Sequence, residues 1–182
     1  MNPLRRDIKE VLISADAIAA KVAELGAEIT RDYQDRDLVM ICVLKGAAPF
    51  FGDLFKSVEL PVRCDFIAIS SYGNATRSSG EVRLIKDVDN SVEGKNVLIV
   101  EDIIDSGLTL SYLKEVFVSR GAKSVQICTL LDKPIRRKVD LTPDYFGFEV
   151  ADEFVVGYGL DYAEKYRNLS DVCVLKEEVY SK

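Results

Sequence analysis

The sequence predicts an α/β fold built on a mostly parallel, twisted sheet flanked by helices. Two apolar runs, at residues 38–44 and 97–100, contain no polar residue, and such runs are typical of strands that are buried on both faces. Residues 15–33 and 108–120 carry apolar side chains at helical spacing, so we expect helices to alternate with the strands. The length of 182 residues is typical of a single domain, 1–182, with a sizeable core.

The other elements follow from the same patterns. Ser14 is a suitable N-cap for the helix at residues 15–33. Residues 71–80 contain two glycines and almost no apolar side chain, which is typical of a mobile loop. In order along the chain, we also expect a short edge strand at 8–13, a helix after residue 48, strands at 62–70 and 81–85, a turn at 87–93, a strand at 124–131 that Pro134 stops, and short strands and turns at 145–175.

The composition is that of an ordinary soluble globular protein. Hydrophobic residues make up 48% of the chain and charged residues 30%, and the formal net charge is −6. The negative charge argues against nucleic acid or an anionic membrane as the main partner. No apolar run approaches the about 18 residues of a membrane span, and the first residues lack the apolar stretch of a signal peptide. We therefore expect a cytoplasmic protein.

The cysteines and the missing histidine restrict the chemistry. The chain contains no histidine, so proton transfer would depend on Asp, Glu, Lys or Tyr, and any metal should be a hard ion bound by oxygen, such as Mg²⁺. The cysteines lie in apolar, strand-like runs without C-x-x-C spacing, which predicts buried free thiols and no zinc site. There are four of them: Cys42, Cys64, Cys128 and Cys173.

The end of the central strand carries the strongest functional signal. Glu101 and Asp102 mark its carboxyl end, where open α/β sheets bind ligands. Their carboxylates would accept hydrogen bonds from a vicinal diol or carry a hydrated metal ion. The alternative is a solvated strand end, but three acids with Ser, Gly and Thr in one loop favour a site.

The residues after this pair are suited to binding a phosphate. Backbone N–H groups of Ser106, Gly107 and Leu108 would point into an anion site at a helix N-terminus. The hydroxyls of Ser106 and Thr109 are further donors. An ordinary turn would explain Asp-Ser-Gly alone, but a phosphate site beside a diol-binding pair predicts a site for ribose 5-phosphate.

Residues 100–109, with the sequence VEDIIDSGLT, resemble the phosphoribosyl diphosphate (PRPP) binding motif of type I phosphoribosyltransferases in its hypoxanthine-guanine form. The resemblance implies a core at residues 15–132 and a small hood built from residues 1–13 and 133–182. It also implies that Asp105 contacts N7 of a purine and acts as the general acid or base. That role has few competitors in a chain without histidine.

Two further segments extend the resemblance. Lys45-Gly46 at the end of a strand resembles the family's pyrophosphate loop, in which the peptide before the lysine is often cis; alone it would be a loop with a solvated lysine. Arg167 is implied as a further pyrophosphate ligand. Ser71-Tyr72 resembles the lid that closes over PRPP to exclude water, although a plain linker would have a similar composition.

Residues 154–162, FVVGYGLDY, resemble the purine-binding hood of hypoxanthine-guanine phosphoribosyltransferases. The resemblance implies that Phe154 stacks on the base opposite Ile103. It also implies that the Val155 backbone and Asp161 bind the edge that carries the 2-amino group of guanine. Periodicity alone would favour simple strand packing.

Lys133 stands at the end of another strand and would select the base. Because an ammonium group has only donors, it suits the 6-oxo oxygen and N7 of hypoxanthine or guanine and disfavours adenine, while xanthine is disfavoured only weakly. The preceding Asp132 adds a charge that could alter base preference. The adjacent Arg136-Arg137-Lys138 cluster is expected to be a solvated face.

Together these features predict a purine-salvage enzyme that uses PRPP and hypoxanthine or guanine to make IMP or GMP and pyrophosphate. The resemblance implies Mg²⁺ as cofactor, held by Glu101, Asp102 and Asp161, and a homodimer or homotetramer. One alternative is a PRPP-sensing regulator that binds nucleic acid on the same fold, and another is a xanthine-preferring transferase. The acidic charge and the intact base pocket favour the enzyme, with small molecules as its partners.

Overall fold

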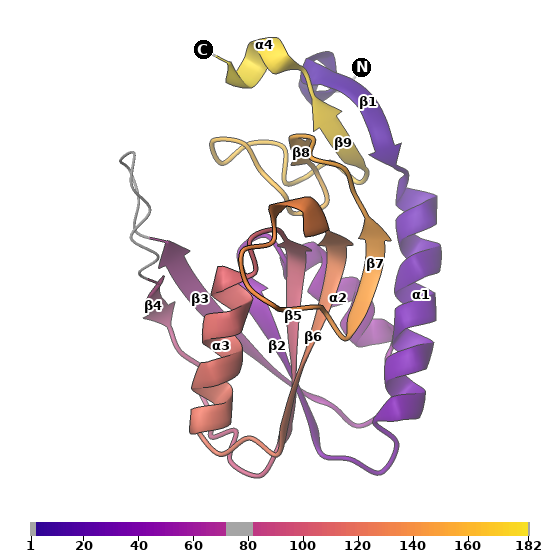
Figure 1. Ribbon diagram of the computed structural model, residues 1–182. Coiled ribbons are helices and arrows are strands. Elements are labelled where there is room, and N and C mark those ends of the chain that lie inside the picture. The colour runs from indigo at the N-terminus through magenta and orange to yellow at the C-terminus, as the bar shows by residue number, and fades with distance from the viewer. Residues whose placement is uncertain (1–2, 72–81, 182) are drawn as a thin grey trace.

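The main element of the molecule is a six-stranded sheet (Figure 1), formed within residues 3–71 and 82–181, which the computed structural model describes. Its strand order is β4-β3-β2-β5-β6-β7, and the pairings are parallel except that of β3 with β4. The predicted α/β fold with a mostly parallel sheet is therefore confirmed. The strands are β2 (Leu38–Leu44), β3 (Arg63–Ser71), β4 (Val82–Lys86), β5 (Asn96–Ile104), β6 (Ser124–Asp132) and β7 (Tyr145–Glu149).

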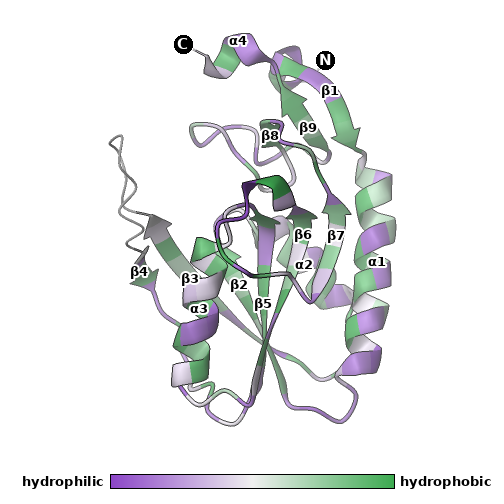
Figure 2. Ribbon diagram, viewed as in Figure 1, coloured by the Kyte–Doolittle hydropathy of each residue, from purple (hydrophilic) through white to green (hydrophobic). Residues whose placement is uncertain are grey.

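Helices cover both faces of this sheet. In Figure 1, α1 (Ala15–Asp32) and α2 (Ala48–Ser57) lie on one face and α3 (Leu108–Ser119) on the other. Successive residues of β2 point to opposite faces: Met40 packs on the side of α1 and α2, and Ile41 on the side of α3. Figure 2 shows hydrophobic residues along the strands and mixed character around the helices. The apolar run of β2 is thus buried on both faces, as predicted.

Local sequence sets the ends of several elements. The Ser14 hydroxyl caps α1 by accepting a hydrogen bond of 3.2 Å from the Ala17 N–H, as predicted. β2 spans residues 38–44, which are the predicted ones. β6 ends at Asp132, two residues before Pro134, which cannot donate a hydrogen bond to a sheet.

A second, antiparallel sheet joins the two ends of the chain beyond the carboxyl ends of the parallel strands (Figure 1). In it, β9 (Val172–Leu175) lies between β1 (Ile8–Ile13) and β8 (Val155–Val156), so the predicted edge strand at residues 8–13 is confirmed. The short helix α4 (Glu177–Tyr180) follows β9. These segments are the ones expected to form the hood, and their action as a hood stays a prediction. A small apolar cluster supports this sheet: Val156, Tyr166, Leu169, Cys173 and Leu175.

One cysteine departs from the sequence prediction. Three of the four are buried free thiols, but Cys64 is exposed. Burial alternates along β3, where Asp65 and Ile67 are buried while Cys64 and Phe66 are exposed. Because alternate side chains of a strand point to opposite faces, the face that carries Asp65 and Ile67 is buried while Cys64 lies on the opposite, exposed face. The prediction of four buried thiols was therefore wrong.

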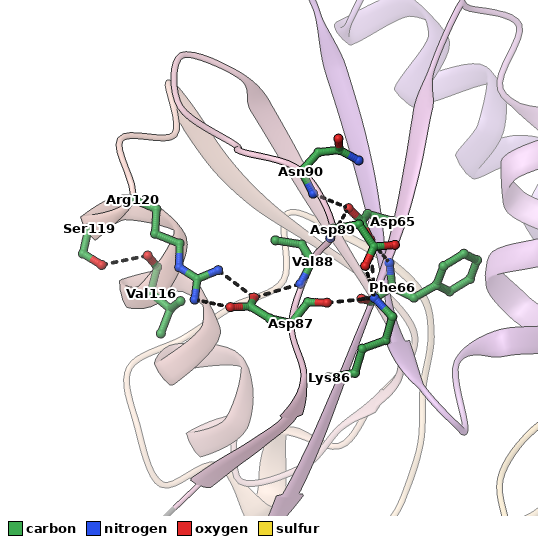
Figure 3. Close-up of polar contacts among 10 residues, drawn as sticks. All are labelled: Asp65, Phe66, Lys86, Asp87, Val88, Asp89, Asn90, Val116, Ser119 and Arg120. Atoms are coloured by element: carbon green, nitrogen blue, oxygen red, sulfur yellow. Dashed lines mark hydrogen bonds and ion pairs between the residues drawn. The ribbon is translucent and has the colours of Figure 1, made fainter.

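A polar network fixes the turn that follows β4 (Figure 3). The buried carboxylate of Asp65 accepts hydrogen bonds from the backbone N–H groups of Asp89 and Asn90, at 2.9 and 3.3 Å. In the same turn, the Asp87 carboxylate accepts two hydrogen bonds of 2.7 Å from the guanidinium of Arg120, which caps α3. The turn is thereby tied to β3 on one side and to α3 on the other.

The predicted lid falls largely outside the described residues. β3 ends at Ser71, while Tyr72 and the rest of the loop to residue 80 are not described. The strand predicted at 81–85 corresponds to β4, whose described part begins at Val82. No helix in the described part of the chain combines the length and the apolar character that a membrane crossing needs.

Candidate functional site

A cavity of about 690 Å³ opens at the carboxyl ends of β2, β3 and β5. Parallel strands place their carboxyl ends at one edge of the sheet, so loops from distant parts of the chain meet there. This is the edge at which the sequence predicts a site. The residues that the cavity brings together include Lys45, Gly46, Glu101, Asp102, Asp161 and Arg167.

The loop between β5 and α3 encloses a smaller cavity of about 140 Å³. Gly107 is the N-cap of α3 and has a φ of +77°, which residues other than glycine rarely adopt. A Cβ at this position would also lie 2.9 Å from side-chain atoms of Arg137 and Val139. Ser106 and Leu108 flank this glycine, and Thr109 lines both cavities. The loop therefore turns tightly into a helix N-terminus, where a phosphate is expected.

Asp105 lies in the same loop. Its side chain is exposed, and its carboxylate accepts a hydrogen bond from the Ser106 backbone N–H. An exposed carboxylate in this position is accessible to a nitrogen of a bound base. Its role as the general acid or base stays a prediction.

Arg137 binds the backbone of the loop between β5 and α3. Its Nε donates a hydrogen bond of 3.0 Å to the Asp105 carbonyl oxygen, and another of its nitrogens pairs with the Asp132 carboxylate. The side chains of Arg137 and Asp132 are only 15% and 11% exposed. The predicted solvated face is therefore wrong for Arg137, although Arg136 and Lys138 are exposed. The Asp132 carboxylate is thus paired with Arg137, and an effect of its charge on base preference stays a prediction.

Glu101 and Asp102 form a crowded acidic pair. Burial raises the pKa of Glu101, and the Asp102 carboxylate raises it further; burial likewise raises the pKa of Asp102. A diol or a divalent cation would stabilise the charged carboxylates. Among the described residues, no group of three acidic or cysteine side chains is placed to hold a metal ion. An ion here would therefore need oxygens of substrate or water as further ligands.

Close contacts of two glycines place the Lys45-Gly46 loop between two other segments. A Cβ at Gly46 would lie 1.8 Å from a carboxylate oxygen of Asp102, and one at Gly159 would lie 1.9 Å from the Gly46 carbonyl oxygen. Glycine is therefore required at both positions for this packing. The Leu44–Lys45 peptide is cis, as the resemblance implies.

The cations predicted to bind pyrophosphate reach the same cavity and are held by hydrogen bonds and ion pairs. Arg167 donates to the Gly159 carbonyl and pairs with the Asp161 carboxylate, each at 2.8 Å. The Arg167 Nε is buried and has no hydrogen-bond partner among the described residues. Lys45 Nζ lies 3.2 Å from the Glu164 carboxylate. Asp161, expected at the purine edge, thus contacts the arginine that is predicted to bind pyrophosphate.

Lys133 is buried at the end of β6. Its Nζ donates a hydrogen bond of 2.8 Å to the Glu153 carbonyl and lies 3.8 Å from the Asp152 carboxylate. Burial lowers the pKa of Lys133. Because an ammonium group has three donors, the bond to Glu153 leaves two for a ligand.

Phe154 is 39% exposed, and one face of its ring is covered. Tyr180 of α4 stacks on it with the ring centroids 4.9 Å apart, and Tyr162 packs at right angles to it with the centroids 5.6 Å apart. Val155 is buried in β8 and Ile103 is half-buried in β5; a base between Phe154 and Ile103 stays a prediction.

Three residues near the site were not identified from the sequence: Arg137, Glu164 and Tyr180. Each contacts a predicted site residue that lies far from it in the sequence, and no local pattern reveals Arg137 or Tyr180. Only Glu164 had a usable signal, because it lies three residues from both Asp161 and Arg167.

The comparison with known proteins agrees with this geometry. The sequence matches the family described as “Phosphoribosyl transferase domain” over residues 11–163. The chain belongs to the phosphoribosyltransferase family. Its relatives include the hypoxanthine-guanine phosphoribosyltransferase of Bacillus subtilis (strain 168), which is 60% identical over 177 residues, covering 97% of this chain and 98% of the relative.

Solved phosphoribosyltransferases have the same fold. A hypoxanthine phosphoribosyltransferase from Staphylococcus aureus is similar with a TM-score of 0.96 at 49% identity, covering 100% of both chains. A hypoxanthine-guanine phosphoribosyltransferase from Bacillus anthracis, solved with a HEPES molecule in its active site, has a TM-score of 0.89 at 52% identity, covering 93% of this chain and 99% of that one. The chain thus lies in the hypoxanthine-guanine branch of the family.

Proposed function

We infer that this phosphoribosyltransferase transfers the 5-phosphoribosyl group of PRPP to N9 of hypoxanthine or guanine, giving IMP or GMP and pyrophosphate in purine salvage. The relatives named above support this activity. One structural observation supports the inference: the loop predicted to bind phosphate, an acidic pair and a buried lysine lie together at the carboxyl ends of the adjacent strands β5 and β6. A ribose 5-phosphate requires the first two, and a 6-oxopurine suits the third.

The loop after β5 would hold the ribose 5-phosphate. The backbone N–H groups of residues 106–109 and the hydroxyls of Ser106 and Thr109 would donate to the phosphate at the N-terminus of α3. Glu101 and Asp102 would accept hydrogen bonds from the ribose hydroxyls, which would stabilise their charged forms.

The base would lie between the phosphate loop and the second sheet. Lys133 would donate to the 6-oxo oxygen and N7, and adenine would present a donor where this lysine needs an acceptor. Phe154 would stack on one face of the base, with Ile103 on the other. The Val155 backbone and Asp161 would bind the opposite edge of the base.

The reaction breaks the bond between C1 of the ribose and the pyrophosphate oxygen, and N9 of the purine forms the new bond to C1. Lys45, the Gly46 backbone and Arg167 would stabilise the charge that develops on the departing pyrophosphate. Asp105 would hold or move the proton at N7 as the base changes its bonding at N9. A lid formed by Ser71 and Tyr72 would exclude water from the site.

We propose Mg²⁺ as the cofactor, because the acidic residues of the cavity are hard oxygen donors. Glu101 and Asp102 would hold it, with Asp161 acting through a water molecule and with water or substrate oxygens completing its coordination. When bound, the ion would neutralise charge on the pyrophosphate group. Removing divalent cations with EDTA should abolish turnover, and adding Mg²⁺ should restore it.

The assembly and the location stay proposals. A homodimer or homotetramer is implied by the family resemblance, and light scattering of the purified protein would distinguish either from a monomer. A cytoplasmic location is expected from the sequence, and fractionation of cells that produce the protein would test it.

The activity can be tested with a spectrophotometric assay that contains PRPP and Mg²⁺ and offers hypoxanthine, guanine, xanthine and adenine separately. Turnover of hypoxanthine and guanine, with little turnover of the other two, is the expected result. Preferred turnover of xanthine would instead favour the xanthine-preferring transferase. Binding of PRPP without turnover of any base would contradict the proposal and favour the PRPP-sensing regulator.

A further inference from the structure

Glu164 occupies a position that no proposed step of the reaction uses. One of its carboxylate oxygens lies 3.2 Å from Lys45 Nζ, and the other lies 3.4 Å from a guanidinium nitrogen of Arg167. A single carboxylate thus bridges two of the groups that the proposed function assigns to pyrophosphate. The nearby positive charges lower the pKa of Glu164, Lys45 having the largest effect, so the bridging carboxylate is charged at neutral pH.

The backbone of the loop aims this side chain at the cations. Ala163 and Glu164 have φ values of +51° and +61°, a left-handed conformation that is uncommon for residues with a Cβ. The loop closes through paired backbone hydrogen bonds between Tyr162 and Lys165, at 3.0 and 3.2 Å. The Glu164 N–H also donates a hydrogen bond of 2.8 Å to the Asp161 carboxylate. These contacts fix the backbone position of Glu164. Its side chain lines the 690 Å³ cavity.

The contacts that Glu164 makes are of a kind that a ligand can replace. The Glu164 and Lys45 side chains are 67% and 70% exposed, and exposed ion pairs contribute little to stability. The Arg167 Nε, which is buried and has no partner among the described residues, gains nothing from Glu164. A pyrophosphate group carries more charge and more acceptor oxygens than one carboxylate, so it can pair with both cations in place of Glu164.

We propose that Glu164 is an internal counter-ion of the pyrophosphate subsite, which holds Lys45 and Arg167 while the site is empty and is displaced when pyrophosphate or the diphosphate of PRPP binds. The proposal rests on the proposed function, because it takes the occupant of this subsite to be pyrophosphate. Glu164 returns to the cations when pyrophosphate leaves. It therefore weakens the binding of pyrophosphate and facilitates its release.

The test is the isosteric substitution Glu164→Gln, which removes the charge and keeps the shape. Isothermal titration calorimetry of magnesium pyrophosphate into the full-length protein should show binding that is about 1.5-fold to fivefold tighter than in the wild type, which is the size of effect that exposed ion pairs produce. The inhibition constant of pyrophosphate in the forward reaction should fall by the same factor. Glu59→Gln is the matched control, because Glu59 is exposed and follows α2 at the opposite end of the parallel strands, and it should leave pyrophosphate binding unchanged.

A second variant separates displacement from a structural role. In a Lys45→Met background, Glu164→Gln should change pyrophosphate affinity less than it does with Lys45 present, because one of the two competing pairs is already absent. Unchanged or weaker pyrophosphate binding by Glu164→Gln with Lys45 present would overturn the proposal, since it would mean that Glu164 does not compete for the cations. A wild-type protein that fails to bind pyrophosphate at all would instead contradict the proposed function.

Discussion

Two regions of the site differ in how they are built. The segment from the end of β5 to the start of α3, residues 101–109, is continuous, so its strand end, turn and helix N-terminus are all adjacent in sequence. The C-terminal part, residues 153–167, is positioned by contacts with residues far away in the chain. Gly159 packs on Gly46 and Phe154 stacks on Tyr180.

This difference separates two kinds of functional residue. A phosphate-binding loop works through backbone groups, so its function depends on local geometry that a short motif can specify. Base binding and leaving-group binding depend on side chains brought together by the fold. We therefore expect substitutions in the first region to affect chemistry directly, and substitutions in the second to act mainly on binding and on packing.

The largest effect is expected in the local region, from Asp105→Asn. If Asp105 exchanges a proton with the base, turnover should fall by about 10²–10⁴-fold. PRPP binding should change little, because the backbone of the loop is kept. Steady-state rates and calorimetric binding of PRPP would measure the two quantities, and near-wild-type turnover would exclude the proton-transfer role.

The next effect is expected from Lys133→Gln, which tests side-chain recognition of the base. Two charge-assisted hydrogen bonds would be weakened, so kcat/KM for hypoxanthine should fall by about 10²-fold. The control is Lys138→Gln, because Lys138 is exposed five residues away. An equal loss in both variants would show that Lys133 is not the residue that recognises the base.

Gly159→Ala tests the contact between the C-terminal region and the pyrophosphate loop. The φ of Gly159 is +102°, and an added Cβ would lie 1.9 Å from the Gly46 carbonyl oxygen, so one of the two loops must move. We expect KM for PRPP to rise about tenfold and the free energy of unfolding to fall by about 1–3 kcal/mol.

The matched control for this substitution is Gly52→Ala. Gly52 lies within α2 and an added Cβ would have nothing within 4 Å, so the free energy of unfolding should rise by about 0.5–1 kcal/mol. Thermal or urea denaturation of both variants would measure the difference. A Gly159→Ala protein with wild-type stability and KM would show that the two loops are not in tight contact.

The smallest effect is expected from Tyr180→Leu, which removes the ring that stacks on Phe154. Aromatic pairs contribute about 0.5–1.5 kcal/mol beyond the area they bury, so KM for the base should rise by about twofold to tenfold while KM for PRPP stays unchanged. Tyr180→Phe keeps the stacking and should behave like the wild type. An equal rise in both KM values would indicate a general structural effect instead.

The same contrast explains how much the sequence could predict. The strand at residues 38–44, the Ser14 cap and the order of strand, loop and helix at residues 97–120 depend on neighbours in the chain, and the structure confirms them. The exposure of Cys64 depends on which face of β3 is covered, and no local pattern records that.

The missed contacts of Arg137 and Glu164 have a similar cause. Arg137 pairs with Asp132 only because the chain reverses after Pro134, where it forms the short 3₁₀ helix Pro134–Arg136. Glu164 meets Lys45 across 119 positions of the sequence. A charge pattern indicates that such residues are polar, but the fold decides whether solvent or a partner faces them.

A crystal structure of the protein with GMP and magnesium pyrophosphate would test the central claim most directly, because it would show whether the two regions form one site. The account predicts the phosphate of GMP at the N-terminus of α3 and the Lys133 Nζ on the guanine O6. It also predicts pyrophosphate between Lys45 and Arg167, with the Glu164 carboxylate displaced. A nucleotide bound away from the residues 101–109 loop, or a guanine that does not contact Lys133, would contradict it.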